Sequence, residues 1–318
     1  MSPRRRTGRK ALAALLPVVL LLLLAVVGLT AWLVYSATRP PRRAYLVTPE
    51  KFARLSDRGL KATEETWQNR DGTQARGWLV RGAEGSPGVL LLHRYGADRS
   101  WLLNLGVKLN ETTNMTVLLP DLRGHGENPP VSASALGATE GDDALGALDF
   151  LRGLKSPQGH ALVGGSLGVY GVEAGAYAAL AAAGREKSVR ALALDSVPDS
   201  PDDVLAAAVR DRTGLDSGPL HALARLGARV YFAGGFKTRA ACTLAEALGD
   251  RQALLLAGEG SGHLRQTTET LAHCFPNPSN VETHTDLPYT GNTLASASPE
   301  QDEVYDRRLI DFFSRTLR

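Results

Sequence analysis

The stretch Ala161-Leu162-Val163-Gly164-Gly165-Ser166-Leu167-Gly168 decides the fold expected of this chain. It reads as a short apolar strand over 161–163, a tight turn, and a helix that begins near Leu167. Its last five residues have the pattern Gly-x-Ser-x-Gly. In a sharp strand-to-helix turn with this pattern, the serine adopts a strained conformation and needs small residues on both sides. Its hydroxyl then stands at a helix N-terminus, where developing negative charge is favoured. The stretch predicts Ser166 as a nucleophile, and an ordinary glycine-rich turn is the alternative.

Strand patterns alternate with helix patterns on both sides of this stretch. A hairpin and five short apolar runs predict strands at 60–68, 74–80, 88–93, 116–120, 189–195, 252–257 and 280–285. Helical spacing predicts helices at 100–109, 140–154, 172–183, 264–273 and 300–316. This order predicts an α/β fold, with a mostly parallel central sheet and helices on both faces. Residues 199–228 break the rhythm and predict a lid-like insert over the carboxyl edge of the sheet.

Three further motifs occur in a fixed order around the serine turn. They are His93-Arg94-Tyr95-Gly96 after a buried strand, Pro120-Asp121-Leu122-Arg123-Gly124-His125-Gly126, and Thr139-Glu140 with Asp142-Asp143 before a helix. Together these motifs resemble those of the α/β-hydrolase fold family from about Gly59 to the C-terminus. The order and spacing are most similar to the exported serine-hydrolase branch that includes serine aminopeptidase-like enzymes.

The resemblance implies a serine hydrolase that acts on an ester or amide through an acyl-enzyme at Ser166. It also implies an oxyanion hole made by the backbone N–H groups of Tyr95 and Leu167, each worth about 3–4 kcal/mol in the transition state. By the same resemblance, His93 and His125, together with Asp121, hold loops in place. The expected mechanism uses no metal and no cofactor.

The acid position of the family pattern, after the strand 252–257, holds Ser261. Glu259 is the nearest candidate acid, and Asp195 or Asp199 after the preceding strand is another.

The base position, before the final helix, holds Asn292, which cannot take a proton at any useful pH. His263, in the loop after the strand 252–257, is the remaining candidate base. The catalytic triad therefore looks degraded. The alternative function is a catalytically inactive protein that binds a ligand or partner in the former active-site cleft.

The N-terminus combines a basic segment, residues 1–10, with an uncharged apolar run at 11–35. Such a run is long enough to cross a membrane, which takes about 20 residues. The sequence predicts a transmembrane anchor at 11–35, a linker at 36–57 and a hydrolase domain at 58–318. A cleaved signal peptide is the alternative. The arginines on both sides of the run give a modest bias towards a cytoplasmic N-terminus and an extracytoplasmic domain.

The composition agrees with one large globular domain behind this anchor. The 318 residues are 22% charged and 43% hydrophobic, and the net charge is +3. Five basic residues lie in the first ten, so the body is nearly neutral and nucleic acid is not an expected partner. The expected partners are a small ester or amide substrate and the membrane. Cys242 and Cys274 lack the spacing of a zinc site, and the sequence leaves open whether they form a disulfide.

Overall fold

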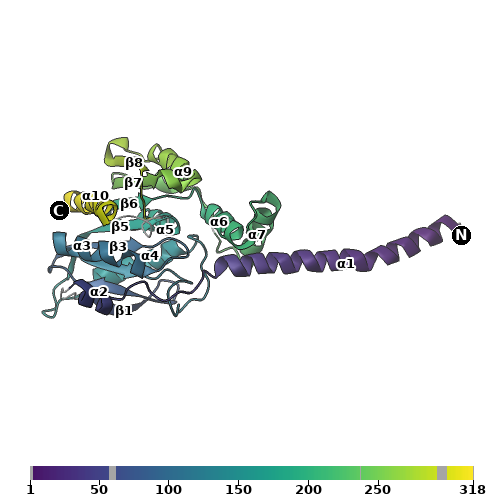
Figure 1. Ribbon diagram of the computed structural model, residues 1–318, viewed down its shortest axis with the longest axis horizontal. Coiled ribbons are helices and arrows are strands. Elements are labelled where there is room, and N and C mark those ends of the chain that lie inside the picture. Colours follow the sequence, from purple (N-terminus) through teal and green to yellow (C-terminus); the bar gives the residue numbers. More distant parts are fainter. Residues whose placement is uncertain (1–2, 57–61, 237, 292–298, 318) are drawn as a thin grey trace. The chain divides into compact units, whose positions relative to one another are not determined.

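The computed structural model describes residues 3–56, 62–236, 238–291 and 299–317. The chain divides into two compact units. One unit comprises Met1–Ala37 and Leu205–Gly234, and the other comprises Thr38–Val204 and Gly235–Arg318. The larger unit contains the sheet, and the smaller one contains the long helix α1 (Figure 1).

The larger unit is built on an eight-stranded sheet with the order β1-β2-β4-β3-β5-β6-β7-β8. The first two pairings, β1 with β2 and β2 with β4, are antiparallel, and all the others are parallel. This confirms the mostly parallel sheet with an antiparallel start that the sequence predicted. The strands are β1 (Ala62–Gln68), β2 (Gln74–Val80), β3 (Ser86–Leu92), β4 (Thr116–Pro120), β5 (Val163–Val172), β6 (Val189–Asp195), β7 (Gln252–Gly258) and β8 (Val281–Leu287).

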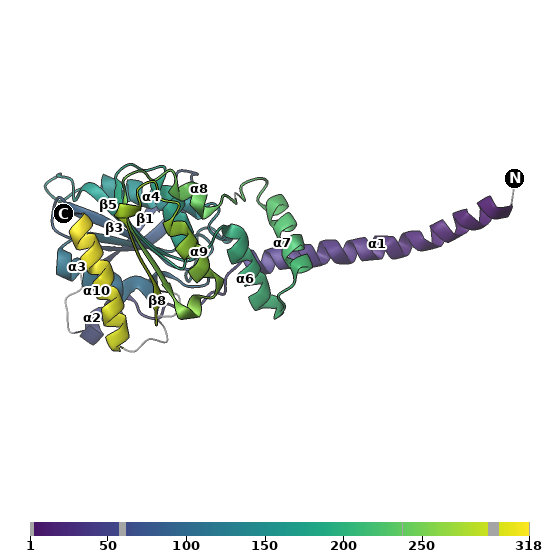
Figure 2. The same cartoon turned by 90° about the horizontal axis from the view of Figure 1, so that it is seen from above.

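Helices cover both faces of the sheet, as expected (Figure 2). One face packs against α4 (Glu140–Gly153), α5 (Ala174–Ala183), α8 (Ala241–Ala245) and α9 (His263–Ala272). The other face packs against α3 (Leu103–Thr113) and α10 (Pro299–Thr316). A short helix that the sequence did not predict, α2 (Pro49–Ser56), lies in the range expected to be a linker.

The central strands are buried on both sides because their apolar side chains alternate between the two helix layers. In β3, Leu90 and Leu92 belong to one core cluster, whereas Val89 and Leu91 belong to the other. All four are fully buried. Each such side chain stabilises the fold by about 1.5–3 kcal/mol relative to an exposed position. The sheet is therefore a rigid platform for the loops at its carboxyl edge.

The course of β5 differs from the prediction that decided the fold. The strand does not end at Gly164 but continues to Val172, and the following helix begins at Ala174. A Cβ on Gly164 would lie 2.6 Å from the carbonyl oxygen of Gly85, and one on Gly168 would lie 2.7 Å from the ring of Phe313. These two glycines therefore allow close packing of a strand, and they do not form a turn.

The smaller unit contains α7 (Gly218–Tyr231), all but the last residue of α1 (Pro3–Thr38), and most of α6 (Pro201–Thr213). The segment Leu15–Thr38 of α1, 24 residues, is long and apolar enough to span a membrane. The segment predicted as a lid-like insert is thus a helical hairpin, and its second helix belongs to one unit with α1.

A disulfide joins Cys242 in α8 to Cys274 just after α9, with their Cα atoms 5.2 Å apart. The sequence had left this pairing open. Disulfides form and persist mainly in oxidising compartments. Within the described residues, no group of three or more His, Cys, Asp or Glu side chains is placed to hold a metal ion.

Candidate functional site

A strand-to-helix turn with the geometry of a nucleophile elbow lies between β5 and α5. Its residues are Gly171-Val172-Glu173-Ala174-Gly175, and Glu173 has φ 49° and ψ −113°. Positive φ is uncommon for a residue with a side chain and marks local strain. A Cβ on Gly171 would lie 2.4 Å from the carbonyl oxygen of Gly175, and one on Gly175 would lie 2.5 Å from that of His93. The turn therefore needs a glycine at both flanking positions, and its pattern is Gly-x-Glu-x-Gly.

Glu173 occupies the place at which an elbow presents its nucleophile. Its side chain is partly exposed, and its Oε2 accepts the backbone N–H of Tyr95 at 3.0 Å. Its own backbone N–H donates to the carbonyl of Asp195 at 2.9 Å, which links the turn to the end of β6. The N-terminus of α5 also favours a negative charge at this point. The oxyanion donor predicted at Tyr95 does face the elbow, but it binds a carboxylate of the protein itself.

The prediction that Ser166 stands at the elbow is wrong. Ser166 is partly buried in the first half of β5, seven residues before Glu173. At about 3.3 Å per strand residue, the two positions lie roughly 20 Å apart along the strand. Leu167 is buried beside Ser166, and its N–H donates to the carbonyl of Ser188 at 2.9 Å, so it does not form an oxyanion hole.

Two buried histidines support the loop that carries Tyr95. His93 donates from Nδ1 to the carbonyl of Arg94 at 2.8 Å, and its Nε2 accepts the N–H of Leu122 at 3.0 Å. His125 accepts the N–H of Gly96 on its Nε2 at 3.0 Å, and its Nδ1 donates to the carbonyl of Arg123 at 2.9 Å. Burial lowers the pKa of His93, and it lowers the pKa of His125 to about 3. Both rings are neutral, with both nitrogens bound to backbone groups, which fits the structural role predicted for them.

Asp121, the third residue predicted to be structural, fixes the segment that follows α1. Its Oδ2 accepts the hydroxyl of Tyr45 at 2.7 Å, and its Oδ1 accepts the backbone N–H of Arg99 at 3.1 Å. The buried guanidinium of Arg99 lies 4.4 Å from the ring centre of Trp78 and donates to Glu64 at 2.8 Å. This network attaches the expected linker to the sheet.

A second buried carboxylate, that of Asp195 at the end of β6, lies where the sequence suggested a triad acid. Its Oδ2 accepts the hydroxyl of Tyr305 and the N–H of Gly291, the latter at 2.6 Å, and its Oδ1 accepts the hydroxyl of Ser196 at 2.7 Å. The hydroxyl of Ser261, the residue that the sequence predicted at the acid position, lies 3.0 Å from the Ser196 hydroxyl. Burial raises the pKa of Asp195 to about 6. Both carboxylate oxygens are occupied by groups that hold the fold together.

The other predicted acid and base residues do not form a triad in the described part of the chain. Glu259 is exposed in a single helical turn after β7. His263 is exposed at the start of α9 and lines a cavity of about 200 Å³ with Asp199 and Cys242. Asn292 lies outside the described residues; the residue before it, Gly291, is the one bound to Asp195.

Known structures resemble the larger part of this chain. An esterase from Pyrococcus furiosus aligns with a TM-score of 0.64 over 88% of this chain and 100% of its own, at 19% identity. The chain has the α/β-hydrolase fold. A dienelactone hydrolase from Anabaena variabilis aligns with a TM-score of 0.57 over 81% of this chain and 99% of its own, at 14% identity. An acetyl xylan esterase from Paenibacillus aligns with a TM-score of 0.53 over 88% and 98%, at 18% identity. No protein-family model and no curated protein sequence matches the chain significantly.

Within this α/β-hydrolase fold, Glu173 is the site residue that sequence reasoning missed. The Gly-x-Ser-x-Gly pattern indicates Ser166, because residues 164–168 match it although they lie within a strand. The missed signal was the position of the helix. The alanine-rich run after Glu173 begins the helix directly, so the turn before it had to contain the elbow. Glu173 directly precedes the first residue of that helix, Ala174.

Proposed function

We propose that this protein is a membrane-anchored, catalytically inactive member of the hydrolase fold that binds a ligand at Glu173 without cleaving it. The observation that carries the proposal is the Glu173 carboxylate, which stands at the elbow and accepts the N–H of Tyr95. The serine-hydrolase function expected from the sequence depended on Ser166 at that elbow, and Ser166 lies within β5.

A carboxylate in this position opposes acyl transfer. The reaction develops a negative oxygen that needs the N–H of Tyr95, and Glu173 already uses that donor. Two negative charges about 4 Å apart repel each other by about 4 kcal/mol at an effective dielectric constant near 20. That energy corresponds to a rate about 10³-fold slower. The elbow of this protein therefore disfavours the transition state that the fold stabilises in hydrolases.

Glu173 also lacks support as a nucleophile in its own right. Carboxylates do attack substrates in some enzymes, but water must then hydrolyse the intermediate, and a base normally activates that water. His93 and His125, which flank the loop of Tyr95, have both ring nitrogens bound to backbone groups. The family's base position holds Asn292. Among the described residues, these two histidines therefore offer no free ring nitrogen that could activate a water to release a covalent intermediate at Glu173.

The chemistry of the elbow selects the class of ligand. In an active hydrolase, this point binds a carbonyl oxygen through N–H donors. Here it presents a partly exposed carboxylate, which accepts hydrogen bonds and attracts positive charge. A ligand with an ammonium or another N–H donor suits Glu173, and a ligand with a carboxylate does not.

A thermal-unfolding comparison tests this proposal with two probes of matched length, hexylammonium and hexanoate. Hexylammonium should stabilise the wild-type protein, by about 1.4 kcal/mol at ten times its dissociation constant, and hexanoate should not. Glu173→Gln should remove the effect, whereas Glu259→Gln, a matched change at an exposed carboxylate, should retain it. Stabilisation by hexanoate, or an undiminished effect of hexylammonium on Glu173→Gln, would overturn the assigned ligand class.

The anchoring part of the proposal is supported by α1, whose span Leu15–Thr38 could cross a bilayer. The basic residues of the first ten positions favour a cytoplasmic N-terminus, which places the hydrolase-fold domain outside. The disulfide between Cys242 and Cys274 fits an oxidising compartment.

A further inference from the structure

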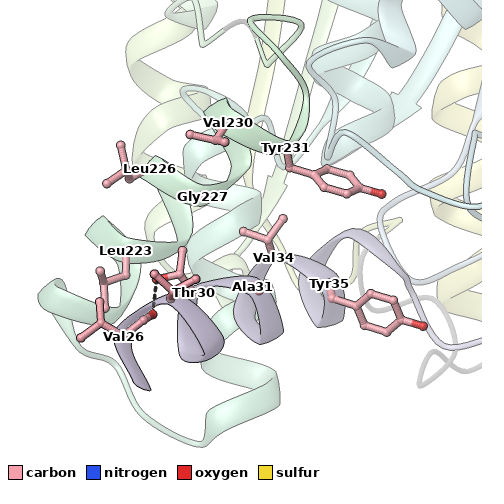
Figure 3. A pocket seen from close by; sticks show the side chains of 11 residues that line it. Val26, Thr30, Ala31, Val34, Tyr35, Leu223, Leu226, Gly227, Val230 and Tyr231 are labelled. Atoms are coloured by element: carbon pink, nitrogen blue, oxygen red, sulfur yellow. Dashed lines mark hydrogen bonds between the residues drawn. The ribbon is translucent and has the colours of Figure 1, made fainter. Parts of the chain in front are cut away.

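A largely apolar groove runs along the smaller unit between α1 and α7. It has a volume of about 550 Å³, within the range of ligand sites, which is roughly 300–1,000 Å³. Figure 3 shows Val26 and Leu223 at one end of the groove and Tyr35 and Tyr231 at the other. The only hydroxyl between those ends, that of Thr30, donates to the carbonyl of Val26 at 2.8 Å.

The two helices that form the groove fit closely at one point. A Cβ on Gly227 of α7 would lie 2.6 Å from a methyl carbon of Thr30 and 2.6 Å from one of Val34. On the same helix, Ala224 and Ala228 are fully buried. Small residues thus bring α7 against the final turns of α1, and the groove is part of a packed helix pair.

Three large apolar side chains of α7 are exposed. Leu226 is 62% exposed, Val230 is 74% exposed and Tyr231 is 48% exposed. With Leu223, they recur at the three- and four-residue spacing that forms one face of a helix. Large exposed apolar side chains that cluster in this way mark a surface that contacts something apolar.

The charges of the predicted insert, taken together, disfavour contact with lipid. The structure separates those charges from the apolar face. The four aspartates at 202, 203, 211 and 216 lie in α6 and in the loop after it. No acidic residue occurs in α7, which contains two arginines, Arg225 and Arg229. Amphipathic helices with basic residues and an apolar face are typical of membrane interfaces.

We propose that α7 lies in the lipid bilayer beside α1 and that the groove holds an acyl chain of a membrane phospholipid. This inference rests on the proposed anchoring by α1. The groove wall on α1, from Val26 to Tyr35, belongs to the candidate membrane span, so the groove lies at membrane depth. The 14 residues of α7 extend about 21 Å, which is too short to cross the bilayer and fits within one leaflet.

The identity of the occupant follows from the chemistry of the groove and of its helix. The lining from Val26 to Val34 and from Leu223 to Val230 is apolar apart from Thr30, which suits a hydrocarbon chain. Arginines bind phosphate through hydrogen bonds and charge. Arg225 and Arg229 are exposed on the same helix, which favours a phospholipid over a neutral lipid.

Photolabelling of the full-length protein in nanodiscs tests the proposal. The probe is a phosphatidylglycerol with a diazirine in the middle of one acyl chain, diluted into phosphatidylcholine, and mass spectrometry locates the adducts. We expect adducts on both α1 and α7. Ala31→Trp, which places an indole in the groove, should remove the α7 adducts. Ala25→Trp, the same change on α1 but outside the groove lining, should retain them.

Three outcomes would contradict this inference in distinguishable ways. Adducts on α1 without adducts on α7 in the wild type would place α7 outside the bilayer while leaving the anchor intact. Absence of adducts on both helices would refute the anchoring itself. If lipid adducts on α7 are absent and Leu226→Cys links two chains by a disulfide, the groove packs against a second copy and not against lipid.

Discussion

Replacement of the elbow carboxylate by serine tests how Glu173 affects the hydrolase site. Glu173→Ser removes a negative charge and frees the N–H of Tyr95, which Glu173 binds at 3.0 Å in the wild type. Serine tolerates this turn in hydrolases, and both flanking glycines, Gly171 and Gly175, remain in place. The substitution should therefore create a hydroxyl nucleophile next to an available oxyanion donor.

The size of the effect follows from the groups involved. One oxyanion donor is worth about 10²–10³-fold in the rate of acyl transfer. Removal of the carboxylate charge also raises the rate. The single variant still lacks a general base, because position 292 holds asparagine, and a base would raise the rate by a further factor of about 10²–10⁴. We therefore expect Glu173→Ser to hydrolyse p-nitrophenyl acetate about 10²-fold faster than the wild type, and Glu173→Ser with Asn292→His to exceed that rate.

The assay compares initial rates of these proteins with the uncatalysed reaction, after circular dichroism has shown that each variant is folded. Ser166→Ala is the control and should leave every rate unchanged, because Ser166 lies within β5. A wild-type protein that is already fast and loses its activity in Glu173→Ser would show that Glu173 is a catalytic nucleophile. If the folded double variant gained nothing, the N–H of Tyr95 would not be an oxyanion donor.

Three further predictions concern stability and anchoring. Burial lowers the pKa of His125 to about 3 in the folded protein. As the pH falls below about 6.5, this histidine therefore becomes protonated in the unfolded chain but stays neutral in the folded one, and the folded state loses stability. The free energy of unfolding in urea should therefore drop by about 2 kcal/mol more between pH 7 and pH 5 in the wild type than in His125→Gln; equal drops would refute this cause. Loss of the disulfide in Cys242→Ala with Cys274→Ala, whose partners are 32 residues apart, should lower the free energy of unfolding by about 3–4 kcal/mol, and an unchanged urea midpoint would argue against the pairing. The full-length protein should remain in the membrane pellet after carbonate extraction, and recovery of a soluble form that begins beyond Tyr35 would show a cleaved signal peptide instead.

The fold was predictable from the sequence because its strands have a simple pattern. A strand buried on both faces, such as β3 with Leu90 to Leu92, appears as a continuous apolar run between polar loops. The motifs around His93 and Asp121 placed two loops at the carboxyl edge of the sheet, and their hydrogen bonds show that the residues hold those loops. The local sequence was therefore sufficient to predict both the buried strands and the two loops.

The site was not predictable in the same way, because the elbow is defined by backbone geometry and not by a residue pattern. Gly164 and Gly168 fit a serine elbow in sequence, yet both are needed for strand packing against Gly85 and Phe313. The glutamate at the true turn falls outside a pattern that requires serine. Its positive φ of 49° became visible only in three dimensions.

The groove between α1 and α7 was hidden for a different reason. The insert 199–228 contains many charged residues, but its behaviour depends on how they are divided between its two helices. The acidic residues lie in α6 and the loop, and α7 retains an apolar face. Contact between α7 and the N-terminal helix joins segments about 190 residues apart in the chain, and the local sequence pattern does not show such a contact.

The most direct test of the central claim is the intact mass of the full-length protein after treatment with a fluorophosphonate, which reacts with an activated serine. The claim is that Glu173, and not Ser166, occupies the elbow. We predict no adduct on the wild type and one adduct on Glu173→Ser with Asn292→His, located at residue 173 by peptide mapping. A stoichiometric adduct at Ser166 in the wild-type protein would contradict the account.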